Sequence, residues 1–124
     1  MEETRRILLV EDDPDGQVLV THVLQYLDMP IDVAGDAEQA LRYLFQTDTA
    51  YRAVILDLAL PGRDGWELLT DIQSNAKTAQ LPCVAVTAFH TSKIREEAMR
   101  AGFAAYFAKP IDAISFAREL EALL

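Results

Sequence analysis

The sequence predicts an α/β fold in which one doubly wound, five-stranded parallel sheet carries helices on both faces. Five short apolar runs alternate along the chain with five segments whose apolar residues recur at helical spacing. This alternation is typical of a parallel sheet, because each helix returns the chain to the edge where the next strand begins. The connecting segments are short, and 124 residues are enough for one hydrophobic core. We therefore expect a single domain over residues 1–124.

The first half of the chain contains three predicted strands and two predicted helices. The strands are the apolar runs Ile7–Val10, Ile31–Ala34 and Ala53–Leu56. The charged Asp32 interrupts the second run, which suits a strand at the edge of the sheet. A helix is expected at Pro14–Leu27, where Asp13 is available as the N-cap. Another begins after Asp36, which forms a capping pair with Gln39.

The second half repeats this pattern. Asp64 follows a turn-forming Pro61-Gly62 pair and can cap a third helix. The remaining strands are expected at Cys83–Val86 and Ala104–Phe107, and the remaining helices at Ser92–Ala101 and Ile111–Leu124. Because Leu124 closes the last helix with no linker after it, we expect a stand-alone protein. A fragment of a larger regulator or of a hybrid kinase is the alternative.

Composition excludes several functions. Twenty acidic residues against 11 basic ones give a net charge of −9, so the average field repels nucleic acid and direct binding to it is not expected. The acidic start Met1-Glu2-Glu3 is unlike a secretory signal, and no apolar stretch is long enough to insert into a membrane. The lone Cys83 lies in an apolar run, which favours a buried thiol in a reducing compartment. We expect a cytoplasmic protein.

Polar side chains follow four of the five predicted strands. Asp12 and Asp13 follow the first strand, Asp57 the third, Thr87 the fourth and Lys109 the fifth. In an open α/β sheet the carboxyl ends of the strands form the ligand site, so these side chains are expected to converge. The turn after the first strand lacks the glycine spacing that cradles a pyrophosphate, which argues against a dinucleotide site.

Three converging carboxylates need a compensating positive charge. At a separation of about 4 Å, each pair repels by about 4 kcal/mol at an effective dielectric constant of about 20. Lys109 can offset one charge, and the oxygen-rich donor set favours Mg²⁺ for the rest. With the cation bound, the site attracts phosphate. Asp57 can then act as a nucleophile without a general base, because carboxylates form acyl phosphates.

These residues resemble the receiver domains of two-component response regulators, and the resemblance covers almost the whole chain. It rests on four stretches: Leu9-Val10-Glu11-Asp12-Asp13, Asp57-Leu58-Ala59-Leu60-Pro61-Gly62-Arg63-Asp64-Gly65, Val86-Thr87-Ala88, and Gly102 followed by Tyr106-Phe107-Ala108-Lys109-Pro110. The resemblance implies the strand order 2-1-3-4-5 and a cis Lys109–Pro110 bond. Arg63 departs from the family pattern, which has an apolar residue at that position.

The resemblance also implies the role of each site residue. Asp57 is the phospho-acceptor, and Thr87 and Lys109 each contact a phosphoryl oxygen. The Mg²⁺ ligands are Asp12, Asp13, Asp57 and the backbone carbonyl of Ala59.

The family pattern further implies a switch, in which Thr87 moves toward the phosphoryl group and the ring of Tyr106 moves inward behind it. Tyr106 filling core space with its hydroxyl outward is the alternative to this role. The expected phosphoryl donor is a histidine kinase or a phosphotransfer protein, and the altered surface signals to an unknown downstream protein. A homodimer is also compatible with the final helix.

Two other functions compete with the phosphorylation switch. A metal-dependent phosphatase of the haloacid dehalogenase type would carry a second aspartate two residues after its nucleophile, where this chain has Ala59. A receiver-like module could instead bind partners without being phosphorylated. We expect a signalling protein that catalyses only its own phosphorylation and dephosphorylation.

Overall fold

The computed structural model describes residues 5–62 and 64–124 and confirms the predicted doubly wound fold. In these residues the strands are β1 (Arg6–Val10), β2 (Ile31–Ala34), β3 (Tyr51–Asp57), β4 (Cys83–Thr87) and β5 (Ala105–Ala108). The helices are α1 (Pro14–Tyr26), α2 (Ala37–Phe45), α3 (Gly65–Gln73), α4 (Ser92–Ala101) and α5 (Ala113–Leu123). All neighbouring strands pair in parallel in the order β2-β1-β3-β4-β5, as the resemblance implies.

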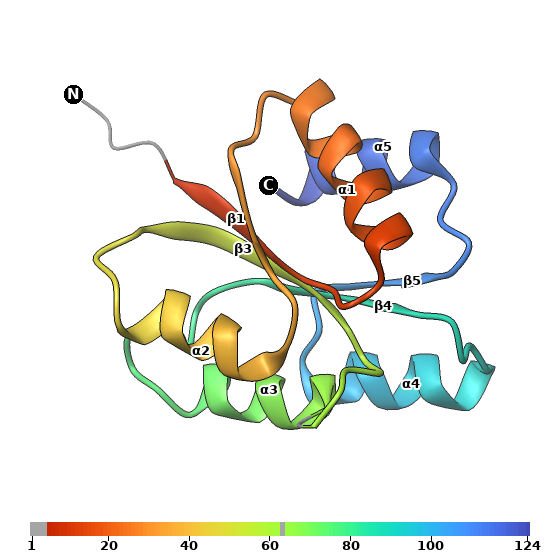
Figure 1. Ribbon diagram of the computed structural model, residues 1–124. Helices are drawn as coiled ribbons and strands as arrows, with labels where there is room; N and C mark the ends of the chain where they lie inside the picture. Colours follow the sequence, from red (N-terminus) through yellow and green to blue (C-terminus); the bar gives the residue numbers. More distant parts are fainter. Residues whose placement is uncertain (1–4, 63) are drawn as a thin grey trace.

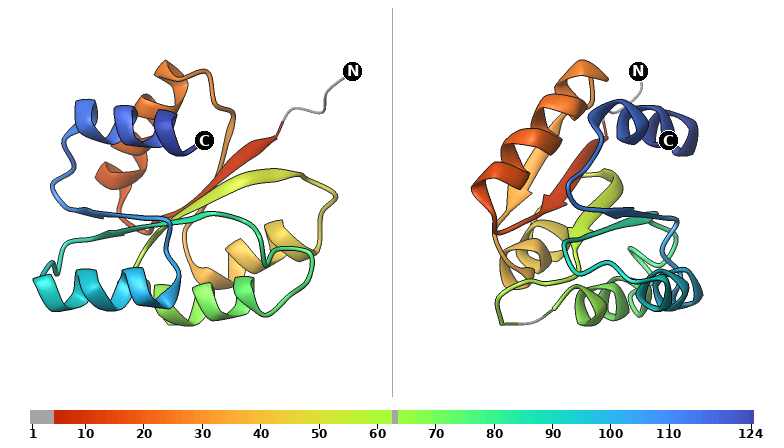
Figure 2. Two further views of the ribbon diagram at one scale, coloured as in Figure 1. Left: turned by 180° about the vertical axis from the view of Figure 1, so that it is seen from behind. Right: turned by 90° about the vertical axis from the view of Figure 1, so that its right-hand side faces the viewer.

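The helices form two layers around the sheet. Helices α1 and α5 cover one face, and α2, α3 and α4 cover the other (Figure 1). Figure 2 shows the same sandwich from behind and from the side. Alternate residues of a strand point to opposite faces, so β1 contributes to both hydrophobic cores. Leu8 packs in one core with Ile72 of α3, whereas Leu9 packs in the other with Val23 of α1 and Phe116 of α5.

The predicted helix caps are all present. Asp13 accepts a hydrogen bond from the Gly16 N–H at 3.1 Å and caps α1. Asp36 accepts one from the Gln39 N–H at 2.8 Å and caps α2, and Asp64 caps α3 in the same way. Each bond satisfies a donor that the first turn of a helix leaves without an intrahelical partner. The caps therefore fix where these helices leave the ends of the strands.

The element boundaries differ from the predicted ones by a few residues. Strand β3 begins two residues early, because Tyr51 and Arg52 extend the pairing beyond the apolar run. Strand β5 lies one residue later than predicted, and α5 begins at Ala113 because Asp112 caps it. Strand β2 is at the edge of the sheet, as its charged residue indicates. Arg63 and the acidic start Met1-Glu2-Glu3 lie outside the described residues.

An aromatic contact joins α3 to the segment between α4 and β5. The ring of Trp66, the only tryptophan of the chain, packs edge-on against Phe103 with ring centroids 5.9 Å apart. Phe103 belongs to the core cluster that contains Tyr106, and the partly buried Trp66 packs against that cluster. This contact links the α3 side of the domain to the α4–β5 side.

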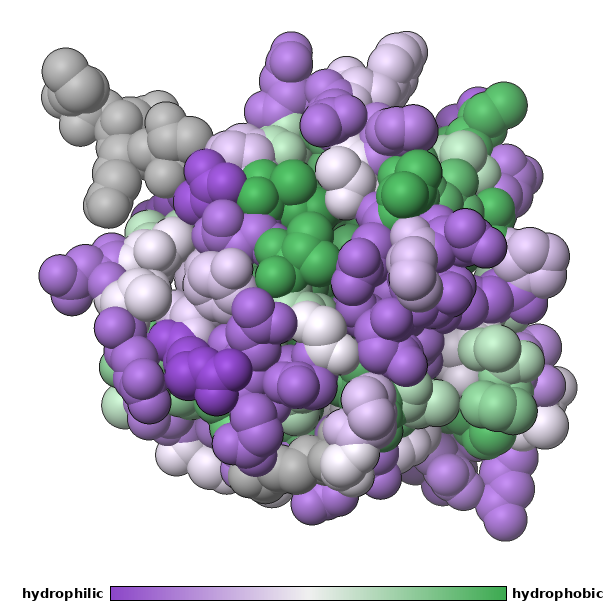
Figure 3. Space-filling view, viewed as in Figure 1, coloured by the Kyte–Doolittle hydropathy of each residue, from purple (hydrophilic) through white to green (hydrophobic). Residues whose placement is uncertain are grey.

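The polar residues on the surface and the burial of the single thiol agree with the composition. Figure 3 shows hydrophilic residues over most of the visible face. Cys83 is buried at the start of β4, and burial raises the pKa of its thiol to about 12. Among the residues that the structure describes, none of the helices combines the length and apolar character needed to cross a bilayer.

Candidate functional site

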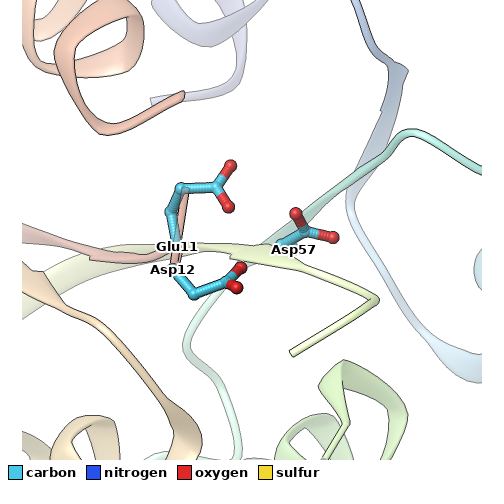
Figure 4. Close-up of side chains that lie close together, drawn as sticks. All are labelled: Glu11, Asp12 and Asp57. Atoms are coloured by element: carbon cyan, nitrogen blue, oxygen red, sulfur yellow. The ribbon is translucent and has the colours of Figure 1, made fainter. Parts of the chain in front are cut away.

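An acidic cluster lies at the carboxyl ends of β1 and β3. Figure 4 shows its three side chains, Glu11, Asp12 and Asp57, gathered at this edge of the sheet. Each residue offers a carboxylate oxygen within 4.8 Å of those of the other two. Glu11 and Asp57 are buried, whereas Asp12 is exposed. The cluster is therefore buried on the side of Glu11 and Asp57 and open to solvent on the side of Asp12.

Asp57 is held at both carboxylate oxygens. It is the last residue of β3, and it is only 5% exposed. Its Oδ1 accepts a hydrogen bond of 2.8 Å from the backbone N–H of Ala59, and its Oδ2 accepts one of 2.7 Å from Lys109 Nζ. Charge-assisted bonds of this kind restrict the orientation of a carboxylate. The strand end and these two donors together fix the position of the predicted nucleophile.

Glu11 is a site residue to which the sequence alone assigned no role. It follows β1 directly, and Lys109 Nζ donates to its Oε1. The N–H of Asp13 donates to its Oε2 over 3.3 Å. Burial raises the pKa of Glu11 and the charge of Asp57 adds to the effect, while Lys109 opposes it. The signal in the sequence was the position of Glu11 directly after the buried run Ile7–Val10, at the tip of the strand.

Asp13 does not join the cluster. Its carboxylate accepts from the Gly16 N–H and caps α1, as its position before Pro14 indicates. The expectation that Asp12 and Asp13 converge with Asp57 is thus corrected: the acidic pair that lies beside Asp57 is Glu11 and Asp12. The physical reason is that one side chain cannot turn toward the N-terminus of α1 and into the cluster at once.

Lys109 is the positive group of the site. Burial alone would lower the pKa of Lys109, but its hydrogen bonds to Asp57 and Glu11 outweigh burial and raise it. A backbone hydrogen bond positions Lys109 beside the end of β4: its N–H donates to the carbonyl oxygen of Thr87 over 2.8 Å. The Lys109–Pro110 peptide bond is cis, as the resemblance implies.

Thr87 and Tyr106 lie on neighbouring strands beside the cluster. Thr87 ends β4, is buried, and accepts the Phe89 N–H at its Oγ1. Tyr106 in β5 is 8% exposed, and its hydroxyl lies 3.0 Å from Nδ1 of His90. This contact places His90 against the ring of Tyr106, which the family pattern expects to move inward. Tyr106 is thus in a packed position in this structure.

Replacing Lys109 with methionine is expected to lower the free energy of unfolding at pH 7 by about 1–3 kcal/mol in the absence of metal. The substitution leaves two buried carboxylates, Glu11 and Asp57, without their shared positive partner. The pKa of Glu11 is raised in the folded state. Ionisation of Glu11 therefore lowers the stability of the folded state when the pH lies above that pKa. Below its ordinary value of 4.5 both states bind the proton and the penalty disappears.

The difference between wild type and Lys109→Met should therefore shrink as the pH falls from 7 toward 4.5, which urea unfolding in EDTA would measure. Lys77→Met is the matched control, because Lys77 Nζ donates to the carbonyl oxygen of Leu44 and touches no carboxylate of the cluster. A pH-independent loss in Lys109→Met would contradict the role assigned to Glu11.

The sequence profile of the response regulator receiver domain matches residues 7–121. The chain belongs to this family. The cluster of Glu11, Asp12 and Asp57 lies at the phosphorylation site of the receiver domain. Receiver domains are signalling modules that act with histidine kinases or phosphotransfer proteins and with downstream effectors.

Curated relatives support the same family. An uncharacterized 14.6 kDa protein in the sodA1 3′ region of Leptolyngbya boryana is 34% identical over 112 residues, which cover 90% of this receiver domain and 84% of that protein. Response regulator RppA from Synechocystis sp. is 34% identical over 118 residues, which cover 95% of this receiver domain and 50% of RppA. The receiver domain thus spans about half the length of RppA.

Solved structures share the fold. The receiver domain of sensor histidine kinase PA1611 from Pseudomonas aeruginosa is 30% identical, with a TM-score of 0.83 and 97% of each chain covered. That structure holds a magnesium ion in its active site cleft. The chemotaxis protein CheY4 of Vibrio cholerae, 20% identical, shares the fold with a TM-score of 0.86 over 98% of this chain and all (100%) of that one.

Proposed function

We propose that this receiver domain takes a phosphoryl group onto Asp57 in a Mg²⁺-dependent reaction. The observation that carries the proposal is the fixed and buried Asp57 carboxylate, held between the Ala59 N–H and Lys109 Nζ inside an acidic cluster that is open on one side. A general base is not required, because the attacking group is already a carboxylate. The proposed donor is a histidine kinase or a phosphotransfer protein.

The transfer exchanges one bond to phosphorus for another. A carboxylate oxygen of Asp57 forms the new P–O bond, while the bond between phosphorus and the imidazole nitrogen of the donor histidine breaks. The imidazole leaves with the electron pair and takes its proton from water. Lys109 and the Thr87 hydroxyl are proposed to donate to two oxygens of the transferred group, where charge is spread in the transition state.

The residues at the site fit a hard divalent cation. Three carboxylates that share a space of a few ångströms supply oxygen donors of the kind Mg²⁺ prefers, and their exposed side can admit water ligands. We assign the metal to Glu11, Asp12 and Asp57, with the carbonyl of Ala59 as a further ligand. When bound, the cation neutralises the carboxylates and the phosphoryl oxygens.

The readout is proposed to involve Thr87 and Tyr106. Phosphorylation adds roughly 1.5 to 2 negative charges beside Thr87. The hydroxyl of Thr87 accepts only one hydrogen bond from a backbone N–H among the contacts that the described residues show, so its proton is available to a phosphoryl oxygen. A shift of Thr87 changes the space that is available to Tyr106 behind it. A downstream partner that binds one arrangement of these two side chains more tightly then shifts the population of the domain toward that arrangement. The domain is proposed to act in the cytoplasm and to catalyse only its own phosphorylation and dephosphorylation.

The test is the intact mass of the purified wild-type protein after incubation with acetyl phosphate, with Mg²⁺ and with EDTA. We expect the mass of one phosphoryl group to be gained with Mg²⁺ and not with EDTA. No gain under either condition would overturn the proposal and favour a phosphorylation-independent interaction module. Continuous release of phosphate from a phosphomonoester would favour the phosphatase alternative.

A further inference from the structure

Gly16 lies against the carboxylate of Glu11. It is the third residue of α1, and a Cβ atom built on it would lie 2.5 Å from Glu11 Oε1 and 2.9 Å from Glu11 Cδ. Carbon atoms do not approach so closely without displacement, so any side chain at this position must push the carboxylate away. The small size of Gly16 is thus required for the observed position of Glu11.

Backbone conformation does not explain the glycine. The described glycines with positive φ are Gly62 and Gly102, and Gly16 is not among them. Alanine is a better helix former than glycine in a helix such as α1. Gly16 therefore occupies a position where alanine would favour the helix but would collide with the site.

Glu11 has little room to move aside. Its side chain is 1% exposed, and both carboxylate oxygens accept hydrogen bonds, Oε1 from Lys109 Nζ and Oε2 from the Asp13 N–H. The backbone of Glu11 is also held, because its carbonyl oxygen accepts a 2.7 Å hydrogen bond from Gln17 Nε2. A Cβ at position 16 would push Glu11 Oε1 out of the place where Lys109 meets it.

We propose that Gly16 is a positioning residue for the cation site, which sets where the Glu11 carboxylate stands. This inference rests on the proposed Mg²⁺ site. Residues 11 and 16 then form a matched pair. The Glu11 side chain extends over the first turn of α1 and occupies the space where Gly16 has no side chain. An aspartate at position 11 is one methylene shorter, which withdraws its carboxylate from position 16 and makes room for a Cβ there.

The test is a double-substitution cycle read by Mg²⁺ binding in isothermal titration calorimetry. The four proteins are wild type, Gly16→Ala, Glu11→Asp and the double variant. Gly16→Ala is expected to raise the Kd for Mg²⁺ by about 10-fold or more, as displacement of a supporting contact does in other metal sites. In the Glu11→Asp background the same substitution is expected to change Kd by less than about 2-fold, because no atom then fills the space.

Urea unfolding in EDTA separates positioning from damage to the fold. The double variant is expected to be at least as stable as Glu11→Asp, because alanine favours the helix. Gly35→Ala serves as the control, since a Cβ there meets only Gln39 Oε1 at an ordinary 3.8 Å. An equal loss of Mg²⁺ affinity in both backgrounds, or none in either, would overturn the pairing and leave the proposed function intact. Absence of Mg²⁺ binding by the wild type would overturn the cation site and the inference with it.

Discussion

Replacing Asp57 with asparagine is expected to remove the phosphoryl gain from acetyl phosphate completely. An amide has nearly the shape of the carboxylate, but its oxygen carries no full negative charge to attack phosphorus. Its nitrogen is a donor, so the amide can accept only one of the two hydrogen bonds that Asp57 receives from the Ala59 N–H and Lys109 Nζ. Intact mass after incubation with Mg²⁺ and acetyl phosphate measures the effect.

The matched control for this substitution is Asp36→Asn. Asp36 caps α2 from outside the acidic cluster, and asparagine is about as good an N-cap. This control is expected to gain one phosphoryl group as the wild type does. If Asp57→Asn still gained the group in a Mg²⁺-dependent manner, the acceptor would be another residue and the role assigned to Asp57 would be lost.

Replacing Gly65 with alanine is expected to destabilise the domain by about 3 kcal/mol and to disturb the site at the same time. Gly65 begins α3 and approaches the end of β3 so closely that a Cβ would lie 2.5 Å from the Asp57 carbonyl oxygen and 2.7 Å from Leu58 Cα. These are backbone atoms, so no side-chain rotation relieves the overlap. The hydrogen bond from the Gly65 N–H to the Leu58 carbonyl, 3.0 Å long, would also be strained.

The midpoint of urea unfolding measures this effect. Gly35→Ala is the comparison, because its added methyl group has room and alanine restricts the unfolded chain, so a small change of either sign is expected. Gly65→Ala should also slow phosphorylation, since the overlap is relieved only by moving the backbone of Asp57 or α3. A variant as stable as the Gly35→Ala control would show that α3 is free to shift away from the strand.

The position of the site was predictable because parallel strands place their carboxyl ends at one edge. Asp57, Thr87 and Lys109 each end or follow a recognisable apolar run, and the structure brings the side chains of Asp57 and Lys109 to within 2.7 Å. The order of the strands was not predictable from alternation alone, because the pattern says that strands are parallel and not which ones are neighbours. It followed from the resemblance to receiver domains.

The identity of the acidic pair was harder to read. Glu11, Asp12 and Asp13 are three consecutive carboxylates beyond the end of β1, and their residue types are equally suited to a metal. Which two face the cluster depends on the path of the chain into α1. The cap formed by Asp13 decides it, because that bond turns the third side chain toward Gly16. The contact between His90 and Tyr106 was not predictable from the sequence either, since it joins a loop residue to a strand residue 16 positions away.

The edge-on contact between Trp66 and Phe103 gives the domain an internal optical reporter. Indole emission depends on its surroundings, and the single tryptophan packs on the cluster that holds Tyr106, whereas the acidic cluster is built from other residues. Fluorescence from this protein therefore reports on packing between α3 and the α4–β5 side. A spectral change on phosphorylation would show that this packing, at the edge of the core cluster that holds Tyr106, differs between the two forms of the domain.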